Sequence, residues 1–130
     1  MHELRVKTRS RNDLVDITAE VQKAVSDSGV DDGVCLLFVP HTTAAVTINE
    51  GADPAVRQDI EAELDKVFPW RDGYAHAEGN SAAHIKTSLV GSSETVIVGG
   101  GRLILGTWQS IYFCEFDGPR DRKVYVRVTA

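Results

Sequence analysis

The sequence predicts a single α+β domain in which an antiparallel or mixed β-sheet system packs against two or three helices. Two observations lead to this prediction. Short strand-like segments occur along the whole chain, and the helical segments between them do not alternate regularly with strands as in a βαβ protein. The 130 residues also fit one domain spanning 1–130, and 42% of them are hydrophobic, which is enough to build one core.

The N-terminal segment predicts a strand followed by a helix. Apolar and charged residues alternate over 4–8, which is the period of a half-buried strand. After a turn at 11–13, Thr18 can cap a helix, and Gly29 suits the C-terminal end of that helix. The apolar positions of this helix share one face, which we expect to be buried: Val21, Ala24 and Val25.

Two strands are predicted next. The segment 34–39 is continuously apolar, so we expect a strand that is buried on both faces and stops at Pro40. A second strand over 44–48 leads into the polar residues Asn49 and Glu50.

Two helices follow these strands. Asp53 and Pro54 form a strong helix start, with the aspartate at the N-cap and the proline at the first helical position. Apolar residues then recur at helical spacing: Val56, Ile60, Leu64 and Val67. Pro69 ends this helix, a loop follows, and Ser81 is predicted to cap a short helix that runs to Leu89.

The C-terminal part predicts further strands, over 95–98, 102–105, 111–115 and 124–128. The glycines Gly99–Gly101 lie between two of them and predict a hairpin turn. Glycine runs can also hold phosphate, but phosphate loops lead into a helix, whereas here a strand follows. We therefore interpret these glycines as a turn.

Composition argues against several classes of function. The formal net charge of −5 repels nucleic acid and anionic lipid, and no apolar run reaches the roughly 20 residues of a membrane span. The first residues lack the apolar stretch of a secretory signal, so we expect a cytoplasmic location. Cys35 and Cys114 lie within apolar runs without Cys-x-x-Cys spacing, so we expect free thiols in the core.

Basic residues are concentrated near the two ends of the chain: Arg5, Lys7, Arg9 and Arg11 near one, and Arg120, Arg122, Lys123 and Arg127 near the other. Pairing of the terminal strands would bring them together. They then form either a solvated strand face or a local anion site.

Three histidines lie at predicted boundaries between elements. His41 follows the strand that stops at Pro40, His76 lies in the loop before the short helix, and His84 lies on that helix. If they converge, they can form a three-nitrogen metal site with an open position, as in catalytic zinc sites. Because they come from three separate elements, sequence spacing leaves convergence and metal binding open.

A second polar cluster lies where a strand meets a helix. Asn49 and Glu50 precede the helix N-terminus at Asp53, which suits a ligand or a general base. Asp53 can equally serve as the helix cap alone. Farther along, Trp108 is interpreted as core or interface filler, and Gln109 requires hydrogen-bond partners if it is buried.

Taken together, these segments resemble the YjbQ-like family of small proteins, often described as secondary thiamine-phosphate synthases. The resemblance spans nearly the whole chain and is carried by separated motifs: His41-Thr42-Thr43-Ala44, Thr47-Ile48-Asn49-Glu50, Asp53-Pro54, Arg57-Gln58-Asp59, His76-Ala77-Glu78-Gly79-Asn80, Ala83-His84-Ile85-Lys86, Gly106-Thr107-Trp108-Gln109 and Glu115-Phe116-Asp117-Gly118-Pro119-Arg120.

The resemblance implies an α+β fold with packed sheets, a homotrimer and a polar site around His41, His84, Asn49, Glu50 and Asp53. It also implies a reaction that joins a pyrimidine diphosphate to a thiazole phosphate and releases diphosphate. That reaction needs cationic groups or Mg²⁺ to stabilise the leaving group.

The leading hypothesis is an enzyme that acts on small phosphorylated substrates, with His41, Glu50 and His84 as catalytic residues and Glu50 in proton transfer. The residues expected to bind substrate are Thr42, Thr43, Asn49, Asp53, Asn80, Lys86, Gln109 and Arg120. Two alternatives remain: a metal-dependent phosphate-ester hydrolase that uses zinc or magnesium at His41, His76 and His84, and a non-catalytic module that binds an anionic metabolite.

Overall fold

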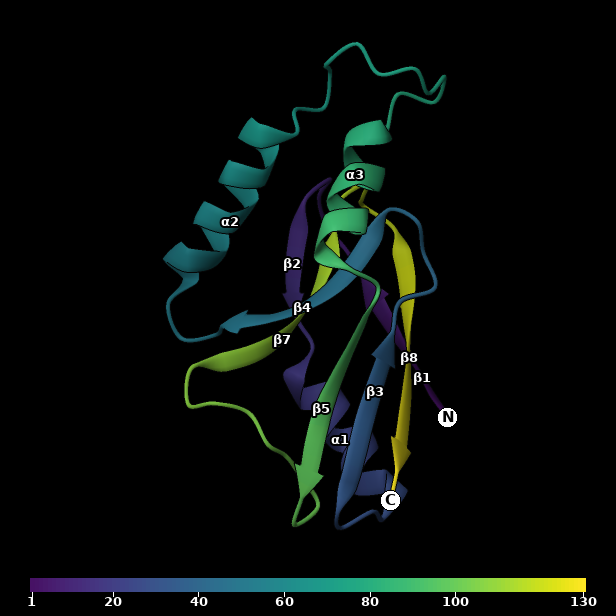
Figure 1. The fold of residues 1–130 in the computed structure, drawn as a ribbon, viewed down its shortest axis with the longest axis vertical. Coiled ribbons are helices and arrows are strands. Elements are labelled where there is room, and N and C mark those ends of the chain that lie inside the picture. Colours follow the sequence, from purple (N-terminus) through teal and green to yellow (C-terminus); the bar gives the residue numbers. More distant parts are fainter.

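The chain folds into two antiparallel sheets and three helices (Figure 1). The computed structural model describes residues 1–130. The larger sheet has the order β1 (His2–Lys7), β8 (Asp121–Thr129), β3 (Gly33–Phe38), β5 (Ser93–Gly99) and β6 (Arg102–Leu103). The smaller sheet has the order β2 (Asp13–Asp16), β7 (Gln109–Glu115) and β4 (Ala44–Glu50). The predicted α+β class is confirmed.

The main core lies between the larger sheet, the smaller sheet and helix α1 (Thr18–Ser28). The predicted buried face of α1 is confirmed, and Gly29 closes the helix with a φ of +72°. The prediction that Thr18 caps the helix is wrong, because Ile17 occupies the N-cap position and Thr18 is the first helical residue. The Thr18 hydroxyl instead donates to Asp16 and accepts the N–H of Ile111 at 2.8 Å, which ties α1 to β7.

The strand β3 corrects one prediction. Cys35 and Leu37 are buried, but Val34, Leu36 and Phe38 are 41%, 42% and 46% exposed. The expectation that both faces of this strand are buried is therefore wrong for a single chain. Side chains alternate between the faces of a strand, and no element of the chain covers the outer face of the larger sheet.

The helices α2 (Pro54–Val67) and α3 (Ser81–Val90) lie beside the smaller sheet. The segment 68–80 joins the two helices at the top of Figure 1. The predicted start of α2 is confirmed, because Asp53 accepts the N–H of Ala55 at 2.9 Å and Pro54 is the first helical residue. A small core cluster that includes Tyr112 and Phe116 lies beside them, yet no residue of α2 is fully buried.

Several smaller expectations were also tested. The hairpin at 99–101 is confirmed, with positive φ at Gly100 and Gly101, and both cysteines are free and buried. Strand β2 was not predicted, since its four residues follow the turn expected at 11–13. None of the three helices is long and apolar enough to span a membrane.

Candidate functional site

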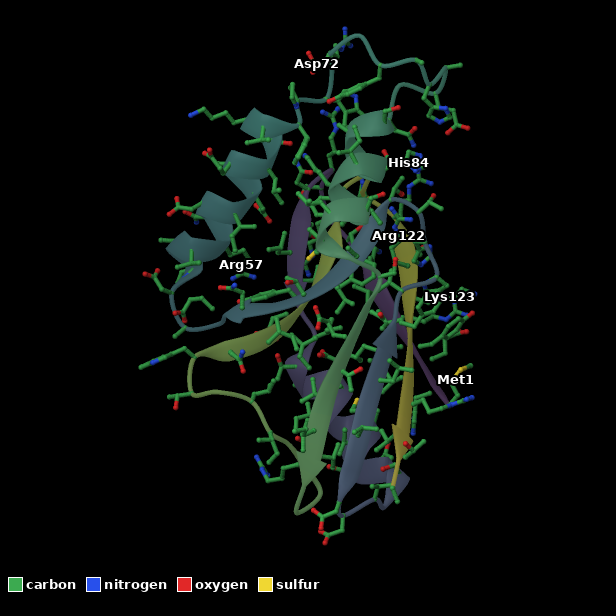
Figure 2. All side chains as sticks on the ribbon, in the orientation of Figure 1. Met1, Arg57, Asp72, His84, Arg122 and Lys123 are labelled. Atoms are coloured by element: carbon green, nitrogen blue, oxygen red, sulfur yellow. The ribbon has the colours of Figure 1, made fainter.

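The three predicted histidines line one polar pocket of about 490 Å³, which we call the histidine pocket. None of its lining residues is hydrophobic: Pro40, His41, Thr42, Thr43, His76, Glu78, Asn80, His84, Asp117, Arg120 and Arg122. They come from the segment between β3 and β4, from the start of α3 and the loop before it, and from the start of β8 and the segment leading into it. Figure 2 shows His84, Arg122 and Lys123 along one side of the molecule.

His41 is oriented by the backbone of β8. Its Nε2 accepts the N–H of Lys123 at 3.1 Å. Burial lowers the pKa of His41, and the nearby positive charge of Arg122 lowers it further. At neutral pH the imidazole is therefore uncharged, and because Nε2 accepts a hydrogen bond, the ring proton is on Nδ1.

His76 and His84 meet edge to face, with their ring centroids 5.5 Å apart and an interplanar angle of 87°. The Glu78 carboxylate lies 3.8 Å from His76 Nε2. No three His, Cys, Asp or Glu side chains in the structure are grouped closely enough to hold a metal ion as they stand. Zinc or magnesium binding at His41, His76 and His84 stays a prediction, and of these three residues His76 and His84 contact each other.

Arg122 is held at the base of the pocket by a buried ion pair. Glu115 is completely buried, and its Oε1 accepts Arg122 Nε at 2.8 Å and the Thr8 hydroxyl at 2.7 Å. Arg122 Nη2 donates to the other oxygen of Glu115 and to the Thr43 hydroxyl at 2.8 Å. Arg122 Nη1 makes no hydrogen bond within the chain, so this donor is free for a ligand.

The Glu115 carboxylate is ionised in this arrangement. Burial by itself would raise its pKa, but hydrogen bonds from Arg122, Thr8 and the N–H of Asp117 outweigh burial and hold the pKa below its usual value. The ion pair therefore holds Arg122 at the pocket as a fixed cation, with the buried Glu115 carboxylate as its countercharge.

The N-terminus of α3 forms another wall of the pocket. Asn80, and not Ser81 as predicted, occupies the N-cap position of this helix. The Asn80 side chain does not cap the helix, because its Nδ2 donates to Asp117 at 2.9 Å and its buried Oδ1 has no partner. The first N–H groups of the helix, at Ser81 and Ala82, have no intrahelical acceptor. Arg120 also donates to Asp117, at 3.0 Å, with its side chain half exposed.

Other predicted site residues lie outside the histidine pocket of their own chain. Glu50 and Asp53 line a separate pocket at the opposite end of β4 from Thr43. Six residue steps along the strand separate Ala44 from Glu50, which is roughly 20 Å. The Glu50 carboxylate accepts the N–H of Ala52 at 2.8 Å, so it is engaged in the turn before α2.

Asn49, Lys86 and Gln109 also lie outside the histidine pocket. Asn49 lines an apolar cavity next to α2. Lys86 is buried on the other side of α3 from His84, and its Nζ bonds Asp65. The exposed Gln109 accepts the N–H of Gly106 at 2.8 Å within its own turn.

The structure adds Glu115, Asp117 and Arg122 to the site. Arg122 was predicted only as one of several basic residues near the C-terminus. One sequence signal could have found it: Arg122 shares the inward register of β8 with Val124 and Val126, and a charged side chain on that face requires a buried partner.

The fold and the pocket define a class of protein: a small two-sheet α+β domain that carries a polar, histidine-lined pocket. The chain belongs to the UPF0047 protein YjbQ-like family, whose model matches residues 2–130. It is 52% identical to UPF0047 protein YugU of Bacillus subtilis over 126 residues, which covers 96% of each chain. It is also 52% identical to UPF0047 protein MJ1081 of Methanocaldococcus jannaschii, over 95% of this chain and 90% of that protein.

Solved structures agree with this assignment. A crystal structure of an uncharacterised YjbQ/UPF0047 family protein from Clostridium acetobutylicum superposes with a TM-score of 0.98 at 57% identity, covering 99% of this chain and 100% of that chain. A YbjQ-like protein of unknown function from Sulfolobus solfataricus gives a TM-score of 0.94 at 34% identity, over 98% and 94% of the two chains. The names of these relatives assign no reaction.

Proposed function

We propose that the protein is an enzyme that binds a small phosphate-bearing molecule in the histidine pocket. The observation that carries this proposal is the fixed guanidinium of Arg122, held by Glu115 and Thr43 with Nη1 left free. A guanidinium oriented before the ligand arrives suits the oxygens of phosphate, because its donors are planar and permanently charged.

The N-terminus of α3 supports an anionic ligand independently of Arg122. Free N–H groups and the helix dipole favour negative charge at this end of a helix. The buried Oδ1 of Asn80 has no partner in the chain, which fits a site completed by a ligand hydroxyl, amine or bridging water. The half-exposed Arg120 adds a second cation at the rim.

The reaction class that we propose releases a phosphate or diphosphate group, as in the thiamine-phosphate synthase-like condensation implied by the family resemblance. Arg122 and Arg120 would stabilise the charge that develops on the departing oxygens. The neutral His41 can donate a hydrogen bond from its Nδ1–H to a ligand oxygen, while His76 and His84 are candidates for proton transfer. Glu50 lies too far along β4 to act in the same chain's pocket, so its proposed role in proton transfer requires a neighbouring copy.

The test is an assay of the purified protein with the pyrimidine diphosphate and the thiazole phosphate together, and with each alone. His41→Ala and His84→Ala are each expected to lower turnover by about 100-fold or more, the usual effect of removing a hydrogen-bond donor to the departing oxygens or an acid–base group. His2→Ala, on β1 and outside the pocket, is the matched control and should leave turnover unchanged. Turnover that neither pocket variant alters would remove the assignment.

A metal-dependent phosphate-ester hydrolase is a second candidate, favoured by the contact between His76 and His84. It predicts hydrolysis of phosphate esters that is lost on chelation and restored by zinc or magnesium. Activity that chelation leaves unchanged argues against it. A non-catalytic module remains the alternative if a phosphorylated ligand binds tightly without turnover and Glu50→Gln does not alter its affinity.

We also propose that the protein assembles with itself, as a homotrimer, in the cytoplasm. The outer face of the larger sheet carries exposed apolar side chains on neighbouring strands: Val34, Leu36 and Phe38 on β3, and Ile97 on β5. Adjacent exposed hydrophobic residues of this kind are typical of an interface. Burial of this face by another copy would restore the two-sided burial that the sequence of β3 predicts.

A further inference from the structure

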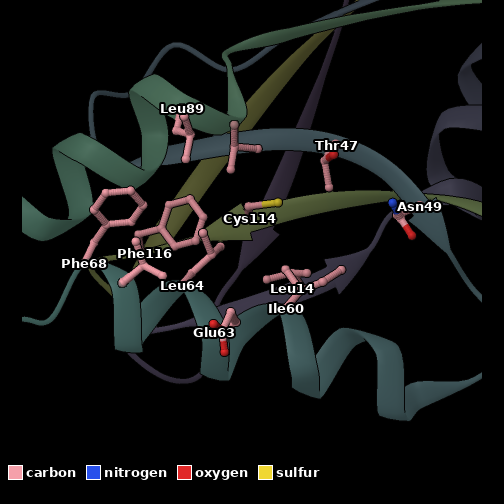
Figure 3. A pocket seen from close by; sticks show the side chains of 12 residues that line it. Leu14, Thr47, Asn49, Ile60, Glu63, Leu64, Phe68, Leu89, Cys114 and Phe116 are labelled. Carbon is pink, nitrogen blue, oxygen red and sulfur yellow. The ribbon is translucent and has the colours of Figure 1, made fainter.

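A second cavity, of about 470 Å³, lies between α2, α3 and the smaller sheet and shares no residue with the histidine pocket. We call it the α2 cavity. Nine of its twelve lining residues are hydrophobic. Figure 3 shows Phe68, Phe116 and Leu64 toward one end and Thr47 and Asn49 at the other, so the cavity has an apolar end and a polar end.

Polar contacts attach one side of α2 to β2, at the edge of the smaller sheet. Arg57 Nη1 donates to the carbonyl of Leu14 at 3.1 Å, and Glu61 accepts the N–H of the same residue at 3.0 Å. Asp65 accepts Asn12 Nδ2 at 2.8 Å. Positions 57, 61 and 65 share one side of the helix. On the apolar side, Ile60 and Leu64 pack against the small core cluster but stay only partly buried, and no residue of the helix is fully buried, so space is left between α2 and the sheet.

We infer that the α2 cavity binds a neutral small molecule with an apolar body and one hydrogen-bond acceptor, such as a long-chain alcohol or ketone. The volume falls in the range of roughly 300–1,000 Å³ that is typical of ligand sites, and a mostly apolar lining with few polar groups is typical as well. The inference is independent of the proposed function, because the two pockets have different walls.

The polar end of the cavity favours a ligand that carries a hydrogen-bond acceptor. Asn49 Oδ1 is occupied by the N–H of Glu50 at 2.8 Å, which leaves its Nδ2 as a free donor. The Thr47 hydroxyl has no partner in the chain. Glu63 contributes the only carboxylate and no cation lines the cavity, so an anionic head group is disfavoured. The Cys114 thiol is neutral, since burial raises its pKa to about 12.

The test uses the neutral fluorescent probe N-phenyl-1-naphthylamine on the full chain. We expect saturable fluorescence enhancement that octan-1-ol reverses and that octanoate reverses at least tenfold less effectively. Val67→Trp should fill the mouth of the cavity and weaken probe binding at least tenfold. Val67 is 57% exposed, so the fold should tolerate the change, and Leu89→Trp, at 65% exposure on the facing helix, provides a second blocking variant.

Ile104→Trp is the matched control, since Ile104 is an apolar residue of similar exposure, 56%, that lies outside the cavity. It should bind the probe like the unmodified chain. Absence of saturable binding, or binding that survives both Val67→Trp and Leu89→Trp, would overturn the site. Equal displacement by octanol and octanoate would overturn its preference for a neutral ligand.

Discussion

The backbone N–H of Lys123 donates to Nε2 of His41 across 3.1 Å, and this bond determines which ring nitrogen faces the ligand. The neighbouring residue, Arg122, supplies the guanidinium at the base of the same pocket. Strand β8 therefore orients both the histidine and the cation. The order of the pocket before ligand binding depends on how this strand pairs with β1 and β3.

His41 is expected to titrate below its ordinary value of 6.5, with the proton of the neutral ring on Nδ1. Burial and the charge of Arg122 disfavour the imidazolium, and Lys123 requires an unprotonated Nε2. Because the unfolded chain then binds the proton more readily, this group contributes stability that declines as pH falls below about 6.5. Long-range ¹H–¹⁵N spectra across a pH titration measure both properties. A proton on Nε2, or a midpoint above 6.5, would contradict the orientation described.

Glu115 is expected to make the protein sensitive to acid. Its folded-state pKa lies below the ordinary 4.5, so its contribution to stability is complete above about pH 4.5 and is lost as pH falls through the lower, folded-state value. Glu115→Gln should lower the free energy of unfolding at pH 7 by about 3 kcal/mol or more, because it leaves Arg122 without its buried countercharge. Urea unfolding of both proteins between pH 3 and 7 provides the test. An equally steep acid dependence in Glu115→Gln would show that another carboxylate is responsible.

Asp53→Ala separates capping from ligand binding. Asp53 caps α2 through the N–H of Ala55, so its removal should lower the free energy of unfolding by about 1 kcal/mol. It lies outside the histidine pocket, so affinity for a phosphorylated ligand should stay the same if each chain forms its own site. Thermal unfolding and a ligand titration on the same variant measure the two effects. A large loss of affinity at normal stability would instead place Asp53 at a site formed with another copy.

Self-association through the outer face of the larger sheet can be tested by placing a charge on it. Leu36→Asp should convert the assembly to monomers, because an aspartate at a closed apolar interface would be buried without a partner. Light scattering coupled to gel filtration should give about three times the chain mass of 14.2 kDa for the unmodified protein and one chain mass for the variant. Val67→Asp, also on an exposed apolar residue but on α2 and away from the larger sheet, should remain trimeric. A monomeric unmodified protein, or a trimeric Leu36→Asp, rules out this interface.

The elements with local signals were predictable from the sequence. Asp53 and Pro54 mark the start of α2, Gly29 marks the end of α1, and alternation marks β1, because each of these signals depends on neighbouring residues only. Strand β2 has four residues and follows a turn, so it carries too little periodicity to be recognised. The exposure of Phe38 was not predictable either, since burial of a strand face depends on what covers it.

The site was partly predictable, because only some of its residues are marked by their neighbours in the sequence. His41 and His84 lie at polar boundaries of elements, which is where pockets form, and the fold brings them to one pocket. Glu50 was expected beside them, but the length of β4 separates the two clusters. Glu115 and Arg122 are recognisable as a pair only when β7 and β8 are placed together, because their partnership is tertiary.

A calorimetric titration with inorganic diphosphate tests the central proposal, that the histidine pocket is an anion site, most directly. The unmodified chain should bind one diphosphate per pocket, and Arg120→Gln should weaken binding about tenfold or more, since a charge-assisted hydrogen bond contributes roughly 1.5–3 kcal/mol. Arg102→Gln removes the same charge from β6, outside the pocket, and should bind like the unmodified protein. No saturable binding, or equal losses in the two variants, would contradict the proposal.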